Sequence, residues 1–200
     1  MPAANIAVVL LAAGQSQRMG QDKLLRQLPN GRRLLEDRIH MIFSAGAAPY
    51  VALPDTPLKH ELVAGASAIP VLVPGDGKGM GDSISAAVQA LPSSITGILI
   101  MLSDLPDVTS DDLRALMARF DGETILRATS QDGRPGHPVV FPTRLRSKLE
   151  TLSGDQGARS LLKSEPVDLF PLPGRNANQD LDTPEDWQNW EQGALNSPRK

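Results

Sequence analysis

The sequence predicts an α/β fold with a mainly parallel sheet and helices on both of its faces. Apolar runs of strand length, at residues 6–11 and 98–102, lack polar alternation, which is typical of strands covered on both faces. Stretches with apolar residues at helical spacing stand between such runs, and this order favours a parallel sheet. The chain has 200 residues, of which 40 % are hydrophobic and 22 % charged, as in one ordinary globular domain.

The N-terminal part of the chain shows the clearest alternation. Thr109 precedes an amphipathic stretch and is the expected N-cap of a helix, since its hydroxyl can accept from a backbone N–H of the first turn. The expected strands are residues 6–11, 50–53, 71–73 and 98–102, and the expected helices lie around residues 35–43, 84–91 and 113–120.

The C-terminal part has a looser pattern. Thr183, Pro184 and Asp186 predict a final helix, with a Thr cap, Pro at the first helical position and an acid at the third. No linker divides the chain, so we predict a single domain over residues 1–192 and a disordered tail over 193–200. The other expected elements are strands at 124–128, 139–141 and 167–169, helices at 143–149 and 158–162, and a loop at 133–138.

Charge and cysteine content exclude several classes of protein. The formal net charge is −3, whereas a general nucleic-acid binder has a strong basic excess. The absence of cysteine excludes disulfides, thiolate metal sites and a cysteine nucleophile. The apolar run at residues 6–13 has no basic flank and is too short to span a bilayer. We therefore expect a cytoplasmic protein without a nucleic-acid or membrane partner.

The first candidate site follows the first strand, where open α/β sheets bind ligands. Gly14 and its neighbours Ala12 and Ala13 leave room for a ligand, and freed backbone N–H groups can hold phosphate oxygens. Arg18 and Lys23 add positive charge for phosphates. The alternative is a solvated loop with two ordinary basic residues, since the stretch matches neither a P-loop nor GxGxxG.

Two aspartates are candidate metal ligands. Asp104 lies in the segment 103–107 directly after the strand at 98–102 and faces the same crevice as the Gly14 loop, so it can hold Mg²⁺ together with substrate phosphates. Asp182 precedes the final helix. The alternatives are a turn-capping role for Asp104 and a helix-capping role for Asp182. The spacing of the two residues does not show whether they meet.

The last candidates are a glycine-rich loop at residues 74–83 and His137. The loop precedes a helix and can lie against a nucleobase, or it can be a plain surface loop. His137 lies between Gly136 and Pro138, and it is the one histidine that we expect to be functional.

Six segments together resemble the MobA-like nucleotidyltransferases, in the family's order and over nearly the whole chain. The nearest branch is the molybdenum cofactor cytidylyltransferases. One departure is Ser103, which stands where the family usually has Gly. The matched segments are residues 11–25 (LAAGxSxRMGxxKLL), 79–83 (GMGxS), 102–106 (a GDxP-type metal turn), 133–138 (GxPGHP), 154–159 (GDxGAR) and 180–186 (DxDTPED).

The resemblance implies a Rossmann-like three-layer sandwich of the nucleotide-diphospho-sugar transferase type. It also implies Mg²⁺-dependent transfer of CMP from CTP to a molybdopterin cofactor, with a molybdoenzyme or its chaperone as recipient and a monomeric or weakly oligomeric state. By position, the resemblance implies that Asp104 and Asp182 bind the metal. The triphosphate would be held by Arg18, Lys23 and the Ala12-Ala13-Gly14 amides, and the base and ribose by Asp76, Gly79, Gly81 and Ser83. The acceptor would lie against His137, Asp155 and Arg159.

Three other functions stay open. A guanylyl- or adenylyltransferase would act on the same cofactor, although the LAAG form resembles the cytidylyl branch rather than the LAGG form of guanylyl transfer. A second alternative transfers a nucleotide to a sugar or polyol phosphate. A third is a nucleotide-binding delivery protein without catalysis, but such a protein could have lost Lys23 or the aspartates, which this chain keeps.

Overall fold

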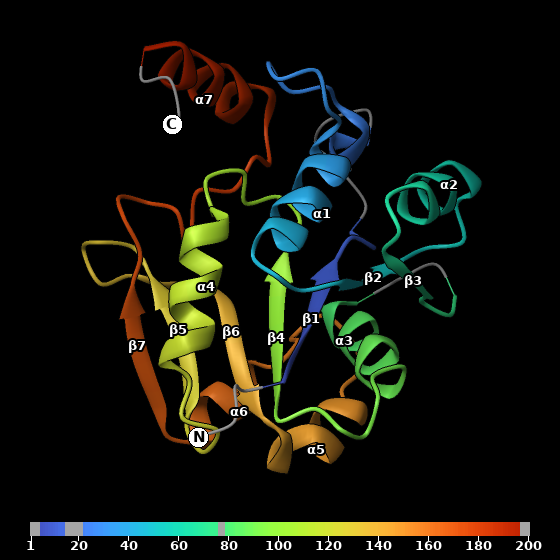
Figure 1. Ribbon diagram of the computed structural model, residues 1–200, viewed down its shortest axis with the longest axis vertical. Coiled ribbons are helices and arrows are strands. Elements are labelled where there is room, and N and C mark those ends of the chain that lie inside the picture. Colours follow the sequence, from blue (N-terminus) through green and yellow to red (C-terminus); the bar gives the residue numbers. More distant parts are fainter. Residues whose placement is uncertain (1–4, 15–21, 76–78, 197–200) are drawn as a thin grey trace.

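The structure is a computed structural model that describes residues 5–14, 22–75 and 79–196. Its centre is a seven-stranded sheet in the order β3-β2-β1-β4-β6-β5-β7, with helices on both faces (Figure 1). Only β6 runs antiparallel to its neighbours. The strands are β1 (Ile6–Leu11), β2 (Pro49–Leu53), β3 (Ile69–Leu72), β4 (Gly97–Leu102), β5 (Ile125–Thr129), β6 (Pro135–Pro142) and β7 (Val167–Pro171).

Both faces of the sheet are buried, which explains the continuous apolar runs. In β1, Val8 and Leu10 belong to one core, while Ala7, Val9 and Leu11 belong to the other. The first core is covered by α1 (Leu34–Ser44), α2 (Pro57–Gly65), α4 (Ser110–Arg119) and α7 (Pro184–Asn196), and the second by α3 (Met80–Gln89), α5 (Arg146–Glu150) and α6 (Arg159–Ser164). The predicted three-layer α/β sandwich is therefore confirmed.

The strand order creates a switch point between β1 and β4. From β1 the chain moves outward through β2 to β3, then returns to the other side of β1 to form β4. The connections that follow β1 and β4 therefore diverge at the carboxyl edge of the sheet, and a crevice opens there in folds of this kind. The short 3-10 helix η1 (Lys23–Leu25) stands at the end of the first of these connections.

Two segments differ from the sequence prediction. Residues 135–138 were expected in a loop, but β6 begins at Pro135, so His137 lies in a strand. Strand pairing continues because Thr129 opposes Pro135 and His137 N donates to Ala177 O at 2.8 Å. The helix predicted at 143–149 is divided into the 3-10 helix η2 (Thr143–Leu145) and α5.

Helix α7 also continues to Asn196, where the sequence predicts the start of a tail at residue 193. Trp187 and Trp190 anchor the helix in the core, and Ala and Leu after Gly193 have high helix propensity. In the part of the chain that the structure describes, no helix is long and apolar enough to cross a membrane.

Candidate active site

Lys23 lies at the centre of the candidate site. Its Nζ atom is 2.8 Å from Asp104 Oδ2 and 2.5 Å from Asp182 Oδ1. The lysine begins η1 after the β1 connection, Asp104 follows β4, and Asp182 precedes α7. Residues that are 81 and 159 positions from Lys23 in the sequence thus share one ammonium group. The structure brings together the three charged residues that the sequence singled out separately.

The electrostatics of this cluster favour the charged form of Lys23. Burial alone would lower the pKa of its ammonium, but the adjacent carboxylates of Asp104 and Asp182 outweigh burial and raise it. Nearby, burial and the negative charges of Asp182 and Asp104 raise the pKa of Asp180. The site is therefore a concentration of acidic groups around one cation, as in sites that bind both a metal ion and phosphates.

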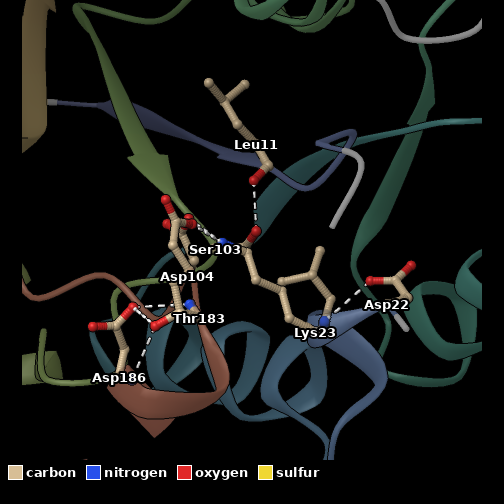
Figure 2. A network of polar contacts seen from close by, with 9 residues as sticks. Leu11, Asp22, Lys23, Ser103, Asp104, Thr183 and Asp186 are labelled. Carbon is tan, nitrogen blue, oxygen red and sulfur yellow. Dashed lines mark hydrogen bonds and ion pairs between the residues drawn. The ribbon is translucent and has the colours of Figure 1, made fainter. Parts of the chain in front are cut away.

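Ser103 holds the turn that carries Asp104. Its Oγ donates to Leu11 O at 2.7 Å and its backbone N donates to the same carbonyl at 3.2 Å (Figure 2). The ends of β1 and β4 are thereby joined beside the site. The serine that replaces the family's usual glycine keeps the aspartate in place and adds a hydrogen bond.

Arg38 of α1 also stabilises the turn that follows Asp104. The sequence analysis did not identify this residue. Only 4 % of the residue is exposed, and its Nη1 donates to Leu105 O at 2.9 Å and to Val108 O at 2.8 Å. These carbonyls belong to the turn that follows Asp104. The available signal was an arginine inside an apolar helical stripe, three residues after Leu35 and four before Ile42.

Helix α7 brings Asp182 to the site. Trp190 Nε1 donates to Asp107 Oδ1 at 2.9 Å, which connects the helix to the β4 turn. Arg26 connects it to η1, because its guanidinium lies 4.3 Å from the Trp187 ring centroid and pairs with Glu191 at 3.0 Å.

The cap of α7 is made by Thr183 and Asp186 rather than by Asp182. Thr183 N donates to Asp186 Oδ2 at 2.8 Å, and Asp186 N donates to Thr183 Oγ1 at 3.2 Å (Figure 2). The capping alternative for Asp182 is therefore wrong, and its carboxylate contacts Lys23 instead.

The two aspartates suit a divalent cation that also contacts phosphates. Asp104 Oδ1 is buried and has no hydrogen-bond partner, so one strong acceptor at the site is left for a ligand. Mg²⁺ typically takes one or two carboxylates plus substrate phosphate oxygens. Within residues 5–14, 22–75 and 79–196, no group of three or more acidic, His or Cys side chains forms a complete metal cage.

The described start of the predicted nucleotide loop, Ala12 to Gly14, has its alanine side chains buried and its glycine exposed. Ala12 and Ala13 are buried in opposite cores, and Ala12 N donates to Ala52 O at 2.8 Å. Gly14 is exposed, with nothing within 4 Å of the position that a Cβ atom would occupy. Arg18 and Asp76, also predicted to bind the nucleotide, lie outside the described residues.

The glycine motif at 79–83 packs against the motif at 154–159. A Cβ atom on Gly79 would come within 2.4 Å of the Gly154 backbone, and Gly81 N donates to Gly154 O at 2.7 Å. Ser83 Oγ donates to Gly79 O at 3.2 Å inside the same helix start. These residues thus have a packing role. Their contact with a nucleotide, and that of exposed Asp155 with the acceptor, stay predictions.

His137 forms the other end of the site, on the first residues of β6. A Cβ atom on Gly136 would lie 2.0 Å from Ala177 O, so only glycine allows the chain that leads to Asp182 to cross here. His137 Nδ1 lies 3.5 Å from Ile100 O. Burial, and to a lesser extent the charge of Arg127, lower the pKa of His137 to about 4, so its ring is neutral at pH 7.

Arg127 of β5 is a second residue that sequence reasoning missed. Its Nε donates to Gly136 O at 3.1 Å, next to His137. Burial, and then the positive charge of Arg159, lower the pKa of Arg127. Among the described residues no carboxylate forms an ion pair with either arginine. Arg127 therefore lies next to His137, and Arg159 is close enough to act on Arg127, with no ion-pair partner for either among the described residues.

The fold and the site define this chain as a nucleotidyltransferase of the nucleotide-diphospho-sugar transferase fold. A solved structure of Rv0371c in complex with manganese, from Mycobacterium tuberculosis H37Rv, is similar to this chain with a TM-score of 0.78 and 26 % identity. The similarity covers 94 % of this chain and 99 % of that one.

More narrowly, the chain belongs to the MobA-like NTP transferase family, whose sequence profile matches residues 8–169. The purine catabolism protein PucB of Bacillus subtilis is 29 % identical, over 90 % of this chain and 92 % of that protein. A molybdenum cofactor guanylyltransferase of Rhizobium johnstonii is 31 % identical, over 91 % and 90 % of the two chains. The resemblance inferred from the motifs is confirmed.

Proposed function

We propose that this protein transfers CMP from CTP to the phosphate of a molybdopterin-type cofactor and releases pyrophosphate. The observation that carries the transferase chemistry is Lys23 Nζ between Asp104 and Asp182 at the switch point of the sheet. This arrangement supports the proposal, because a cation and two carboxylates that could hold a metal ion lie close to the end of β1, from which the Gly14 loop leaves. The acceptor is suggested by the relative of Rhizobium johnstonii and by the motifs of the C-terminal half.

The proposed reaction is a single displacement at phosphorus. An oxygen of the acceptor phosphate forms a bond to the α-phosphorus of CTP, while the bond from that phosphorus to the bridging oxygen of the β-phosphate breaks. Pyrophosphate leaves with the electron pair, and CMP becomes joined to the acceptor through a new diphosphate. The nucleophile is already anionic, so the protein chiefly has to position the reactants and neutralise charge.

The described residues supply that neutralisation at the nucleotide end. Lys23 would contact the triphosphate, and the loop amides after Ala13 would hold its oxygens. Asp104 and Asp182 would hold Mg²⁺, which when bound neutralises phosphate charge and orients the nucleotide. Ser103 and Arg38 keep Asp104 in place through the Leu11, Leu105 and Val108 carbonyls.

At the acceptor end, the unpaired arginines favour an anionic substrate. Arg127 carries positive charge next to a neutral His137, and Arg159 lies near Arg127, so a phosphate or another anionic group of the acceptor would supply the missing counter-ion. A neutral imidazole can accept or donate one hydrogen bond to a polar ring system. This end of the site therefore suits a phosphorylated heterocycle better than an uncharged acceptor.

The choice of CTP rests on the Ala12-Ala13 form of the loop, which resembles the cytidylyl branch of the family. The second candidate is guanylyl transfer to the same cofactor, favoured by the name of the Rhizobium johnstonii relative.

The test is pyrophosphate release with each of four nucleotides, with and without molybdopterin, followed by competition of CTP and GTP in one reaction. We expect release only with molybdopterin and a higher kcat/KM for CTP. A preference for GTP would show that the protein is a guanylyltransferase rather than a cytidylyltransferase. Absence of release with every nucleotide, together with intact nucleotide binding, would favour a delivery protein.

A further inference from the structure

Lys59 is a buried lysine beneath the predicted nucleotide loop, and none of the motifs includes it. It belongs to α2, and only 2 % of the residue is exposed. Its Nζ atom lies 2.7 Å from Asp22 Oδ2 and donates to Ala12 O at 3.2 Å. Ala12 directly follows β1, and Asp22 directly precedes Lys23. A single ammonium group therefore contacts residues at both ends of the connection that contains Gly14.

The buried ammonium group of Lys59 requires an explanation, because removing a charged group from water is costly in free energy. Such a group is tolerated only where a carboxylate and further acceptors compensate it. Here the compensation comes from two segments that are ten residues apart in the chain, rather than from neighbours on α2. A lysine that only filled space could be replaced by an apolar side chain of similar length, and it would not need both contacts.

Asp22 connects Lys59 to the turn that carries Lys23. Its other carboxylate oxygen, Oδ1, accepts from Leu24 N at 3.1 Å and caps η1, the turn that carries Lys23. The Asp22 carboxylate therefore makes two contacts: its Oδ2 atom pairs with Lys59, and its Oδ1 atom accepts from the backbone of the turn that carries Lys23. The chain of contacts runs from α2 through Asp22 to the residue that we expect to bind the triphosphate.

We propose that Lys59 is a positioning residue for the nucleotide: by tying Ala12 to Asp22, it sets the distance between the end of β1 and Lys23. The inference rests on the proposed nucleotide-binding function of that connection. It predicts a defect in nucleotide binding rather than in acceptor binding, because the contacts of the Lys59 ammonium with described residues are to Ala12 and Asp22 and not to the segment of His137. A purely structural lysine would lower stability and leave the affinity of the folded protein for the nucleotide unchanged.

The test is Lys59→Met, which keeps the apolar stem and removes the charge, with exposed Lys163→Met as the matched control. Calorimetric titration of CTP·Mg²⁺ and GTP·Mg²⁺ should show binding to Lys59→Met weakened on the order of 10-fold, since small displacements of positioning groups have large effects. The control should bind like the wild type, and the KM for the acceptor should change less than twofold. Unchanged nucleotide affinity in folded Lys59→Met would overturn the proposal.

A second variant covers the case in which Lys59→Met does not fold. Asp22→Asn removes the charged partner on the more exposed side, where 30 % of the Asp22 side chain is accessible. We expect weaker nucleotide binding here too, and unchanged affinity would contradict the proposal.

Hydrogen exchange of the peptide that contains Leu24 gives a readout that needs no nucleotide. Exchange should be faster in Lys59→Met or Asp22→Asn than in the wild type, because the turn loses its support. If the wild type binds no nucleotide, the proposed function is wrong, even if hydrogen exchange shows that Lys59 stabilises the turn through Asp22. If exchange and affinity both stay at wild-type values, the positioning role alone fails.

Discussion

The proposed nucleotide end and the proposed acceptor end of the site differ in how their positively charged side chains are paired. At the nucleotide end, Lys23 and Lys59 are each paired with carboxylates from other parts of the chain. At the acceptor end, Arg127 bonds only a backbone carbonyl among the described residues, and Arg159 lies near it. Lys23 and Lys59 thus connect protein segments through ion pairs, whereas Arg127 and Arg159 have no ion-pair partner among the described residues.

This difference follows from what each end has to assemble. The proposed nucleotide end combines the two connections that diverge at the switch point with the segment before α7, and ion pairs join all three. The proposed acceptor end is assembled by close backbone packing of Gly136 on Ala177. Its charged side chains are therefore not needed for assembly and can serve recognition.

The largest expected effect is at Asp104, in the turn that we propose holds the metal ion. Asp104→Ala should lower turnover on the order of 10²-fold or more, because it removes an anionic ligand for Mg²⁺ while Ser103 and Arg38 still hold the turn. Turnover is measured over a Mg²⁺ titration, with exposed Asp111→Ala as the control. Near-normal turnover would mean that Asp104 is only a turn residue.

The next effect separates the two ends directly. Lys23→Met should weaken CTP binding on the order of 10-fold or more by removing a triphosphate contact, whereas His137→Ala should leave CTP binding nearly unchanged and raise the KM for the pterin or lower kcat. Calorimetry with CTP·Mg²⁺ and steady-state kinetics with the acceptor measure the two quantities. An equal loss of CTP affinity in both folded variants would contradict the two-ended site.

A smaller effect is expected at Arg127. Arg127→Met should raise the KM for the acceptor by about 10-fold and leave CTP affinity unchanged, because the lost charge lies at the acceptor end. The control is Arg119→Met, which removes an exposed arginine of α4. The assignment is wrong if Arg127→Met affects acceptor binding no more than this control does.

The smallest effect is a pH dependence of stability at His137. Its pKa is about 4 in the folded protein, whereas an unfolded histidine titrates near 6.5. Between these values the unfolded chain binds the extra proton, so stability is lost as the pH falls from about 7 towards 4. His137→Gln should remove on the order of 2 kcal/mol of this loss, measured by denaturant unfolding at pH 7 and pH 4.5. Parallel pH profiles for the two proteins would show that the imidazole is not buried in its neutral form.

The sequence by itself determined the features that depend on local patterns. The apolar runs of β1 and β4 predict buried strands because both faces of the sheet are covered, and Thr109 and Thr183 form the predicted helix caps with Asp112 and Asp186. The motifs also indicated Lys23, Asp104 and Asp182 one by one. Each of these signals lies within a few residues, so it can be recognised without knowledge of the fold.

Only the tertiary structure decided which residues meet. That Asp104 and Asp182 share the Lys23 ammonium depends on the strand order and on the docking of α7 through Trp190 and Asp107. The roles of Arg38, Lys59 and Arg127 depend on burial and on carbonyls from distant segments. A local pattern can indicate that a charged residue is buried, as the apolar stripe around Arg38 does, but it does not identify the groups that the residue contacts. The physical reason is that its partners are supplied by chain segments far away in the sequence, which only the folded sheet brings together.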